Sequence, residues 1–319
     1  MDIRELRCGD YTATINLSRG ANCVSLRHRS LGACVLREPP NDSSEWDNPY
    51  LYGMPILFPV NRISGGQFTF DGYEYRLPIN EPQTGCHLHG TLHQTPFVAQ
   101  QQDERSICCV YRSNGEYSGF PQDFEIRICY EVGETGFTQT THITNFSAQR
   151  LPLLLGFHTT FALPFVKGSD PDQIRIGAEV GELVERNMCN YIPTGRLLSS
   201  DAVTAALNRT DFAPCSEQIS RHYRATGAGT MTLWDPQSGV TVRYRNDAKY
   251  GWRLLYNGEA NAFVCMEPQS CAVDCFNTPY PMHFAPVFSL AQGETETYIS
   301  HISCEKEGEK YENHEAGNP

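Results

Sequence analysis

The sequence predicts an all-β protein built as a large antiparallel β-sandwich. Short segments in which apolar and polar residues alternate recur along the chain, and they are rich in Val, Ile, Thr, Tyr and Phe. Gly, Asn, Asp and Pro separate these segments, and no stretch keeps a 3.6-residue apolar period over three helical turns. Two layers of short strands packed face to face account best for this pattern.

Ten segments carry the clearest strand pattern: residues 11–17, 67–70, 73–77, 106–111, 124–132, 138–145, 230–234, 240–244, 262–266 and 296–302. Between the second and third of them, Asp71-Gly72 predicts a tight hairpin turn, because these residues tolerate the left-handed backbone that such a turn needs. Ser113-Asn114-Gly115 is a second turn of this kind. Residues 200–207 are expected to form a short helix.

We expect one domain over residues 1–304. Its length is ample for a large hydrophobic core, and the 26 Gly and 20 Pro are distributed along the chain with no linker and no internal repeat. Residues 305–319 are charged and carry few apolar groups, so they are expected to form a flexible tail.

The formal net charge of −12 argues against a nucleic-acid or anionic membrane partner, because those surfaces bind Lys and Arg. No segment approaches the ~20 apolar residues of a membrane helix, and the first residues lack the apolar part of a signal peptide. We therefore expect a cytoplasmic protein, monomeric or homodimeric. Its thirteen cysteines are expected to be buried free thiols. Cys271 and Cys275 are a weak candidate metal pair, because no second pair follows at a zinc-site spacing.

Polar residues that could carry out chemistry lie in segments far apart along the chain. Arg62 stands between an apolar run and a Gly-Gly turn. It is either a surface ion-pair partner or a ligand for two adjacent oxygens, which its rigid guanidinium fork suits. His87 and His89 would point to the same face of one strand, as ligand-binding, structural or metal-binding residues. His93 is expected in a solvated loop.

His158 and Glu267 are the two candidates for proton transfer. His158 lies within an apolar run, where an imidazole is pushed towards neutrality and can still exchange a proton; a hydrogen-bonded core histidine is the alternative. Glu267 ends an apolar run just before Pro268, and buried carboxylates are usually paired or functional. One carboxylate with histidines suits proton transfer better than glycoside hydrolysis, which uses two carboxylates.

The segments that carry these residues resemble the aldose 1-epimerases (galactose mutarotases), and more closely their divergent bacterial branch. The resemblance runs from about Gly20 to about Ile302 and rests on four segments: Asn61-Arg62-Ile63 with residues 66–77, Asn80 and 87–90; residues 158–163; Glu267-Pro268-Gln269 with Asp274 and Asn277; and residues 191–195.

The resemblance implies a site that acts on a monosaccharide and needs neither cofactor nor metal. Glu267 would be the general base at the anomeric hydroxyl, and His158 the general acid at the ring oxygen. Arg62 and His89 would hold sugar oxygens. Asn61, His87 and Gln269 complete the predicted substrate-binding set.

One family feature is missing from this sequence. Where family members carry a sugar-binding aspartate in an Asp-His-x-Phe segment, this chain has Ser220-Arg221-His222-Tyr223. Two alternatives to a free-sugar epimerase therefore stay open. One is a hexose-6-phosphate 1-epimerase, which would need further cations beside Arg62, with Arg19, Arg27 and Arg221 as candidates. The other is a catalytically silent sugar-binding protein.

Overall fold

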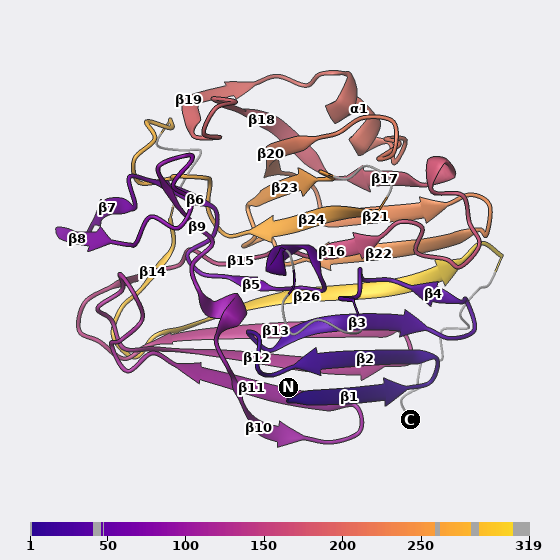
Figure 1. The fold of residues 1–319 in the computed structure, drawn as a ribbon, viewed down its shortest axis with the longest axis horizontal. Coiled ribbons are helices and arrows are strands. Elements are labelled where there is room, and N and C mark those ends of the chain that lie inside the picture. Colours follow the sequence, from indigo (N-terminus) through magenta and orange to yellow (C-terminus); the bar gives the residue numbers. More distant parts are fainter. Residues whose placement is uncertain (1, 41–45, 47, 259–261, 282–286, 309–319) are drawn as a thin grey trace, which may run out of the picture.

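The computed structural model describes residues 2–40, 46, 48–258, 262–281 and 287–308. Every strand pair within them is antiparallel, which confirms the predicted all-β sandwich (Figure 1). One of two eight-stranded sheets has the order β10 (Val98–Gln102), β11 (Ser106–Arg112), β12 (Phe124–Gly133), β13 (Gly136–Asn145), β26 (Thr295–Lys306), β22 (Val240–Asn246), β21 (Thr230–Asp235) and β17 (Arg175–Ala178).

A second large sheet carries the candidate site. Its order is β19 (Pro193–Leu198), β18 (Val180–Arg186), β20 (Ser220–Ala225), β23 (Trp252–Tyr256), β24 (Phe263–Gln269), β15 (Gly156–Phe157) and β5 (Ile56–Leu57), with β16 (Thr160–Ala162) also paired to β24. One face of this sheet packs on the first sheet. For example, the Thr159 hydroxyl lies 3.0 Å from that of Tyr244, whose ring meets Phe161 edge-on.

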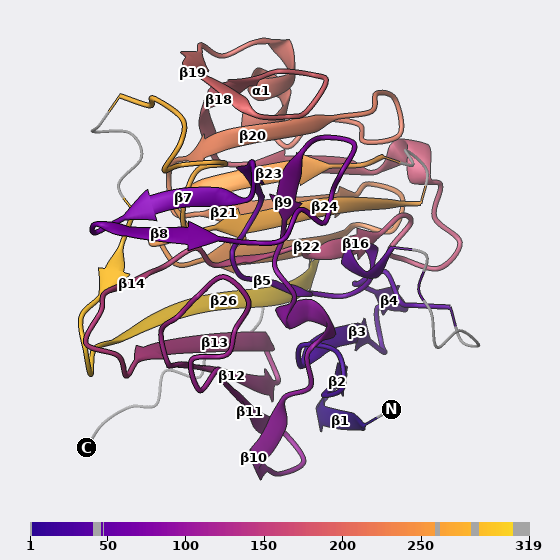
Figure 2. The ribbon, with the colours of Figure 1, turned by 60° about the vertical axis from the view of Figure 1, so that its left-hand side comes forward.

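Smaller elements complete the fold. A four-stranded sheet of β1 (Ile3–Cys8), β2 (Tyr11–Asn16), β3 (Asn22–His28) and β4 (Ala33–Cys34) packs against β12 and β13. The two-stranded pairs are β6 (Arg62–Ser64) with β9 (Cys86–Leu88), β7 (Gln67–Phe70) with β8 (Tyr73–Arg76), and β14 (Leu151–Pro152) with β25 (Ser289–Leu290). Figures 1 and 2 show the β7–β8 hairpin at one end of the sandwich. The helices are η1 (Pro49–Leu51), η2 (Leu92–Gln94), η3 (Pro171–Gln173) and α1 (Ala202–Asn208).

The alternation of apolar and polar residues that predicted the strands corresponds to alternating burial of their side chains in the structure. Along β12, every second residue from Phe124 to Val132 is fully buried, and the residues between them are half-buried or exposed. All ten predicted segments lie in or overlap strands, and Asp71 and Gly72 have φ of 50° and 75°, as the predicted hairpin turn requires. The predicted helix is α1, whose first turn Asp201 caps by accepting a 2.8 Å hydrogen bond from the Thr204 amide.

Two expectations about the chain differ from the structure, and part of a third lies outside the described residues. β24 does not end at Glu267 but continues through Pro268 to Gln269. Glu305 and Lys306, assigned to the tail, pair with β22, since β26 is longer than its apolar part. Residues 309–319 of the predicted tail lie outside the described residues.

The expectation that all cysteines are free is wrong for two of them. Cys108 on β11 and Cys129 on β12 are directly opposite each other in the ladder, with Cα atoms 4.1 Å apart, and they form a disulfide. Directly opposed strand positions are close enough to bridge, which spacing along the sequence does not reveal. The other cysteines are free, and Cys189 is exposed.

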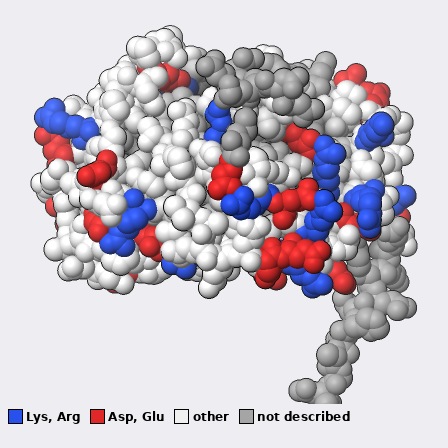
Figure 3. Space-filling model, turned by 60° about the horizontal axis from the view of Figure 1, so that its bottom comes forward, with Lys and Arg blue, Asp and Glu red and all other residues white. Residues whose placement is uncertain are grey.

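Basic and acidic side chains alternate on the face shown in Figure 3. Short-range ion pairs near the start of the chain join Arg4 with Asp2 and Arg7 with Glu5. Among the described residues, none of the helices has both the length and the apolar content that crossing a membrane demands.

Gly90 provides a test of the fold next to the candidate site. It has φ of +65°, and a Cβ at this position would lie 1.9 Å from the Phe58 carbonyl oxygen. Gly32 has a similar φ of +61° but no atom within 4 Å of such a Cβ. We predict that Gly32→Ala costs about 1 kcal/mol, from the left-handed backbone alone, whereas Gly90→Ala prevents folding or lowers the melting temperature far more. Equal melting temperatures for the two variants would contradict the packing described here.

Candidate active site

The site lies on the face of the second sheet that points away from the first. Cys265, Glu267 and Gln269 are alternate residues of β24 and share this face, while Val264 and Met266 point into the main core. All seven residues of β24 are buried because both faces of the strand are covered. This explains why the segment around Glu267 reads as a continuous apolar run.

His158 lies directly across from Glu267 in the same sheet. β15 pairs Gly156 with Gln269, and β16 pairs Thr160 with Cys265 in the same register, so the two residues between the short strands face the middle of β24. His158 Nε2 is 3.2 Å from Glu267 Oε1, and both side chains are buried. The structure therefore brings together the two residues predicted to transfer protons.

Burial shifts the two ionisable groups in opposite directions. Removal from water raises the pKa of Glu267 to about 8, although a hydrogen bond from Gln269 lowers it in part. The same desolvation lowers the pKa of His158 to about 3. Both shifts disfavour charge, so the pair holds one proton between them through the neutral range. When His158 and Glu267 hold one titratable proton in total, one of the two side chains can donate a proton to a bound molecule while the other accepts a proton from it.

A chain of amide side chains orients the Glu267 carboxylate. Gln269 Nε2 donates a 3.1 Å hydrogen bond to Glu267 Oε2, and Asn61 Nδ2 donates to Gln269 Oε1. Gln269 and Asn61 are buried. Gln269 does not line the cavity and acts here on Glu267, whereas Asn61 reaches the cavity wall.

His89 is held as a hydrogen-bond donor towards the cavity. Its Nδ1 accepts a 3.2 Å hydrogen bond from the Asn61 backbone amide, so its proton resides on Nε2. Burial holds the pKa of His89 well below its usual range, so the ring is neutral. Its ring is perpendicular to that of His158, with centroids 5.6 Å apart.

Arg62 lines the cavity and is also an ion-pair partner. Its Nε and Nη2 each donate a 2.7 Å hydrogen bond to a different oxygen of Glu81, and its guanidinium lies 4.7 Å from the centroid of the Tyr191 ring. The sequence left a surface ion pair and a ligand donor open. The ion pair is half-buried at the cavity wall, so both interpretations apply to this residue.

The structure does not bring His87 into the cavity. His89 has φ of 63° and lies beyond the end of β9, so the strand alternation expected to align the two histidines stops before it. His87 Nδ1 instead lies 2.7 Å from the Pro78 carbonyl oxygen. His93 is buried rather than solvated, because η2 packs its ring 4.5 Å from that of Tyr50.

Several cavity residues were not predicted from the sequence. Tyr50 packs its ring 4.8 Å from His89 and 5.9 Å from His158. Glu81 pairs with Arg62, and Arg186 donates to both the carbonyl and the hydroxyl oxygen of Ser220. Tyr191 belongs to a loop that resembles a family segment, which was the one available signal. Ser220, from the segment that lacks the family aspartate, also lines the cavity.

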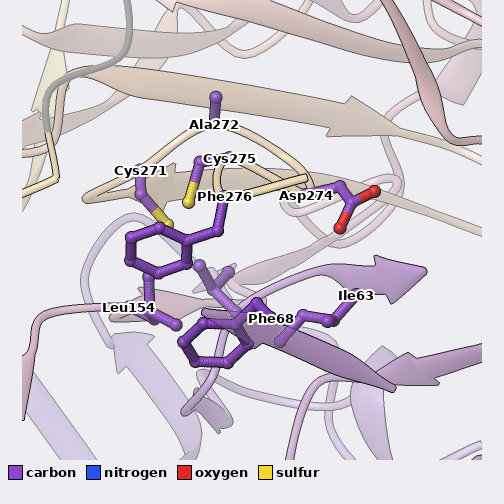
Figure 4. A pocket seen from close by; sticks show the side chains of 9 residues that line it. Ile63, Phe68, Leu154, Cys271, Ala272, Asp274, Cys275 and Phe276 are labelled. Carbon is purple, nitrogen blue, oxygen red and sulfur yellow. The ribbon is translucent and has the colours of Figure 1, made fainter. Parts of the chain in front are cut away.

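The loop after β24 ties this strand to the Arg62 strand. The Asp274 carboxylate accepts a 3.1 Å hydrogen bond from the Ser64 amide and a 2.7 Å one from its hydroxyl, and Asn277 donates to Asp274 at 2.8 Å. Figure 4 shows the neighbouring Cys271, Cys275 and Phe276 side chains gathered near Phe68, with the carboxylate set to one side. Asp274 and Asn277 thus fix the position of β6 beside β24.

The cavity has a volume of about 260 Å³, at the small end of the range for ligand sites. It suits a monosaccharide better than a longer chain. Its lining is Asn48, Tyr50, Leu51, Asn61, Arg62, Glu81, Leu88, His89, His158, Arg186, Tyr191, Ser220, Leu254, Tyr256 and Glu267. Five of the seven predicted site residues line this cavity, namely Asn61, Arg62, His89, His158 and Glu267, whereas His87 and Gln269 do not.

Within the described residues, one set of side chains could hold a metal ion. Ligand atoms of His158, Cys265 and Glu267 all lie within 4.8 Å of one another. Two of these three residues are the pair predicted to transfer protons, and the Cys265 thiol is 3.3 Å from the Thr160 hydroxyl. An ion at this position would occupy the atoms that the proton-transfer chemistry needs.

Comparison with known proteins agrees with this geometry. The family model described as aldose 1-epimerase matches residues 5–301 of the chain. The chain belongs to the aldose 1-epimerase family. This confirms the resemblance drawn from the four sequence segments.

Two Escherichia coli (strain K12) relatives, the uncharacterized proteins YphB and YihR, are similar in sequence. YphB is 25% identical over 76% of this chain and 80% of its own length, and YihR is 24% identical over 86% and 85%. Among solved structures, a galactose mutarotase-like protein from Clostridium acetobutylicum has a TM-score of 0.88 at 23% identity, covering 96% of this chain and 99% of its own. A GalM/aldose epimerase homologue from C. elegans has a TM-score of 0.76 at 20% identity, with 96% and 99% covered. These structures share the fold of this epimerase-family protein.

The raised pKa of Glu267 predicts a pH-dependent stability difference. A carboxyl whose folded pKa is above its unfolded value stabilises the fold fully below the unfolded pKa, and this contribution is lost as pH rises through about 8. Glu267→Gln replaces the protonated acid by a neutral group of similar shape. We predict similar melting temperatures for the two proteins near pH 4, and an advantage of the variant that grows as pH rises and levels off above about pH 8, measured by calorimetry. A difference that does not change with pH would show that Glu267 titrates normally.

Proposed function

We propose that this protein is an aldose 1-epimerase that interconverts the α and β anomers of a sugar by opening and reclosing its ring. The observation that carries the proposal is the buried contact between His158 and Glu267, 3.2 Å apart in a cavity of monosaccharide size. Ring opening takes a proton from the anomeric hydroxyl and gives one to the ring oxygen. These two oxygens are bonded to the same carbon, so a neighbouring acid and base can serve both.

In the proposed opening step, the Glu267 carboxylate removes the proton from the anomeric hydroxyl as the carbonyl forms. The bond between the anomeric carbon and the ring oxygen breaks, its electron pair goes to the ring oxygen, and His158 Nε2 protonates that oxygen. The aldehyde then rotates about its first carbon–carbon bond. Reclosure reverses both transfers: neutral His158 takes the proton from the attacking hydroxyl, and protonated Glu267 returns one to the carbonyl oxygen. Each general acid–base contribution is worth roughly 10²–10⁴ in rate.

The surrounding residues have defined roles in this proposal. His89 would donate its Nε2 proton to a sugar oxygen, and Arg62 would present the remaining edge of the guanidinium that Glu81 anchors. Gln269 and Asn61 would keep the carboxylate aimed at the substrate. His87, outside the cavity, would stabilise the β6–β9 pair through its contact with the Pro78 carbonyl oxygen.

Retention of the acid–base pair also favours an enzyme over a silent sugar-binding protein. Binding alone does not require a desolvated carboxyl, and burying one without using it would be costly. A binding protein would saturate with sugar in calorimetry without speeding anomer exchange, and this outcome would favour the alternative.

The direct test measures anomer exchange by NMR on D-glucose and D-galactose. We predict that Glu267→Gln and His158→Gln each lower the catalysed rate by roughly 10²–10⁴. Glu182→Gln and His142→Gln remove the same groups outside the cavity, on β18 and β13, and are matched controls. If Glu267→Gln exchanges anomers as fast as the wild type, the assigned base is wrong.

The pair also predicts a pH profile. The active form holds one proton, so kcat/KM should be level from about pH 5 to 7 and fall as pH rises through about 8, where Glu267 loses its proton. Gln269→Leu removes the hydrogen bond that lowers the pKa of Glu267. We therefore expect this variant to lose about tenfold in kcat and to shift its alkaline limb to higher pH. If kcat falls but the alkaline limb of the pH profile stays at the same pH, Gln269 affects only the packing of the site and not the pKa of Glu267.

A further inference from the structure

Arg186 is a cation in the cavity without an anionic partner among the described residues. It lies at the end of β18, and its Nη2 donates to the backbone and hydroxyl oxygens of Ser220, which are neutral. Its Nε and Nη1 have no hydrogen-bond partner in the described part of the chain, and neither atom is sealed away from solvent. Two of its three nitrogen atoms are therefore open to a ligand.

The other charged groups on the cavity wall balance one another. Arg62 is paired with Glu81, and His158 and Glu267 share one proton, so each pair is neutral overall. His89 is neutral because its Nδ1 accepts from an amide. The wall therefore carries one uncompensated positive charge, on Arg186.

The Arg186 side chain is half-buried, and this partial burial makes its charge costly. Desolvation, with Arg62 adding to it, lowers the pKa of Arg186 to about 10, which still leaves it charged at neutral pH. Buried charges in proteins are normally paired. Glu267 acts on Arg186 across the cavity, but no carboxylate of the described residues forms an ion pair with it, so a contacting counter-charge is a property expected of the ligand.

The guanidinium groups of Arg62 and Arg186 lie close to the same aromatic ring on the cavity wall. Both guanidinium groups lie over the ring of Tyr191, at 4.7 and 5.7 Å from its centroid. Arg186 also borders a neighbouring surface cavity, but Arg62 and Tyr191 line only the cavity that contains the acid–base pair. An anion held here would therefore be attached to the molecule that His158 and Glu267 act on.

The sheet places this cation away from the reacting carbon. Ser220, which anchors Arg186, is on β20, and Glu267 is on β24, with β23 between them. Two strand spacings correspond to roughly 10 Å. The anionic group would thus sit at the end of the sugar remote from the anomeric carbon.

We propose that the preferred substrate is a sugar bearing an oxyanion group, a carboxylate or a phosphate, at the end remote from its anomeric carbon, bound by Arg186 beside Arg62. The free Nε and Nη1 of Arg186 lie on different edges of its guanidinium, so each can donate one charge-assisted hydrogen bond to either group, and Arg62 offers the edge that Glu81 leaves free. This inference rests on the proposed epimerase activity and goes beyond it by naming the substrate class. The cation predicted beside Arg62 for a phosphorylated sugar is then Arg186, rather than Arg19, Arg27 or Arg221, none of which lines this cavity.

The experiment compares three groups of sugars by NMR anomer exchange, above the uncatalysed rate. D-glucose and D-galactose are neutral, D-glucuronate and D-galacturonate carry a carboxylate, and D-glucose 6-phosphate and D-galactose 6-phosphate carry a phosphate. We expect kcat/KM for at least one anionic group to exceed that of the matched neutral sugar about 10- to 100-fold, the range for a hydrogen bond to a charged group. Whichever set of anionic sugars has the higher kcat/KM shows whether the site prefers a carboxylate or a phosphate.

Arg186→Met removes the charge and keeps much of the side-chain volume. It should reduce the anionic-to-neutral ratio of kcat/KM by about the same 10- to 100-fold. Arg196→Met removes an exposed arginine of β19 and should leave the ratio unchanged. Arg186→Lys should restore part of the preference if charge is what matters, and none if Arg186 only holds Ser220 in place.

The outcomes separate this inference from the proposed function. Exchange of neutral sugars without an anionic preference, or a ratio unaffected by Arg186→Met, overturns the inference and leaves the epimerase intact. If no sugar is exchanged, the proposed function fails, and calorimetry then decides the inference. Tighter binding of an anionic sugar that weakens in Arg186→Met supports it, and equal binding of the neutral and anionic sugars overturns it.

Discussion

The candidate site depends on the register that aligns two short strands with β24. β15 and β16 pair with this strand on either side of His158 in one common register, which leaves the histidine facing Glu267 across the sheet. A shift by one residue would turn both side chains to the opposite face, towards the main core. The hydrophobic face of β24, with Val264 and Met266 packed in that core, opposes such a shift. The packing of the sandwich therefore fixes the distance between acid and base.

Further hydrogen bonds orient the Glu267 carboxyl and determine which ring nitrogen of His89 carries the proton. Gln269 and Asn61 fix one carboxylate oxygen, and Asp274 joins the loop after β24 to the strand that begins with Arg62. His89, in a left-handed conformation after β9, has its donor nitrogen set by the Asn61 amide. Asn61 thus contacts both the base-orienting glutamine and a predicted sugar ligand. Its left-handed backbone, with φ of 63°, allows both contacts from one turn.

The sequence was sufficient to predict the strands with strong alternation and the Asp71-Gly72 turn, and to select His158 and Glu267, which the fold brings into contact. These features have local signals, either a period of two or a polar residue within an apolar run. It was insufficient for features created by pairing between distant strands. The Cys108–Cys129 disulfide depends on register, and the exclusion of His87 depends on a left-handed residue after the strand end. Arg186 stood in an ordinary charged stretch, and only the fold places it at the cavity.

Under the proposed function, the low polarity that shifts the pKa values of Glu267 and His158 would also make Arg186 selective for an anion. In a cavity where burial raises the pKa of Glu267 and lowers that of His158, any uncompensated charge is costly, because little water is present to screen it. A neutral sugar would displace water from Arg186 without supplying a counter-charge, whereas an anionic sugar would supply one. The same desolvation that allows a proton to move between a carboxyl and an imidazole thus favours a substrate that neutralises the guanidinium. In the proposed function, proton transfer and substrate choice would thus have one physical origin, the burial of the β24 face.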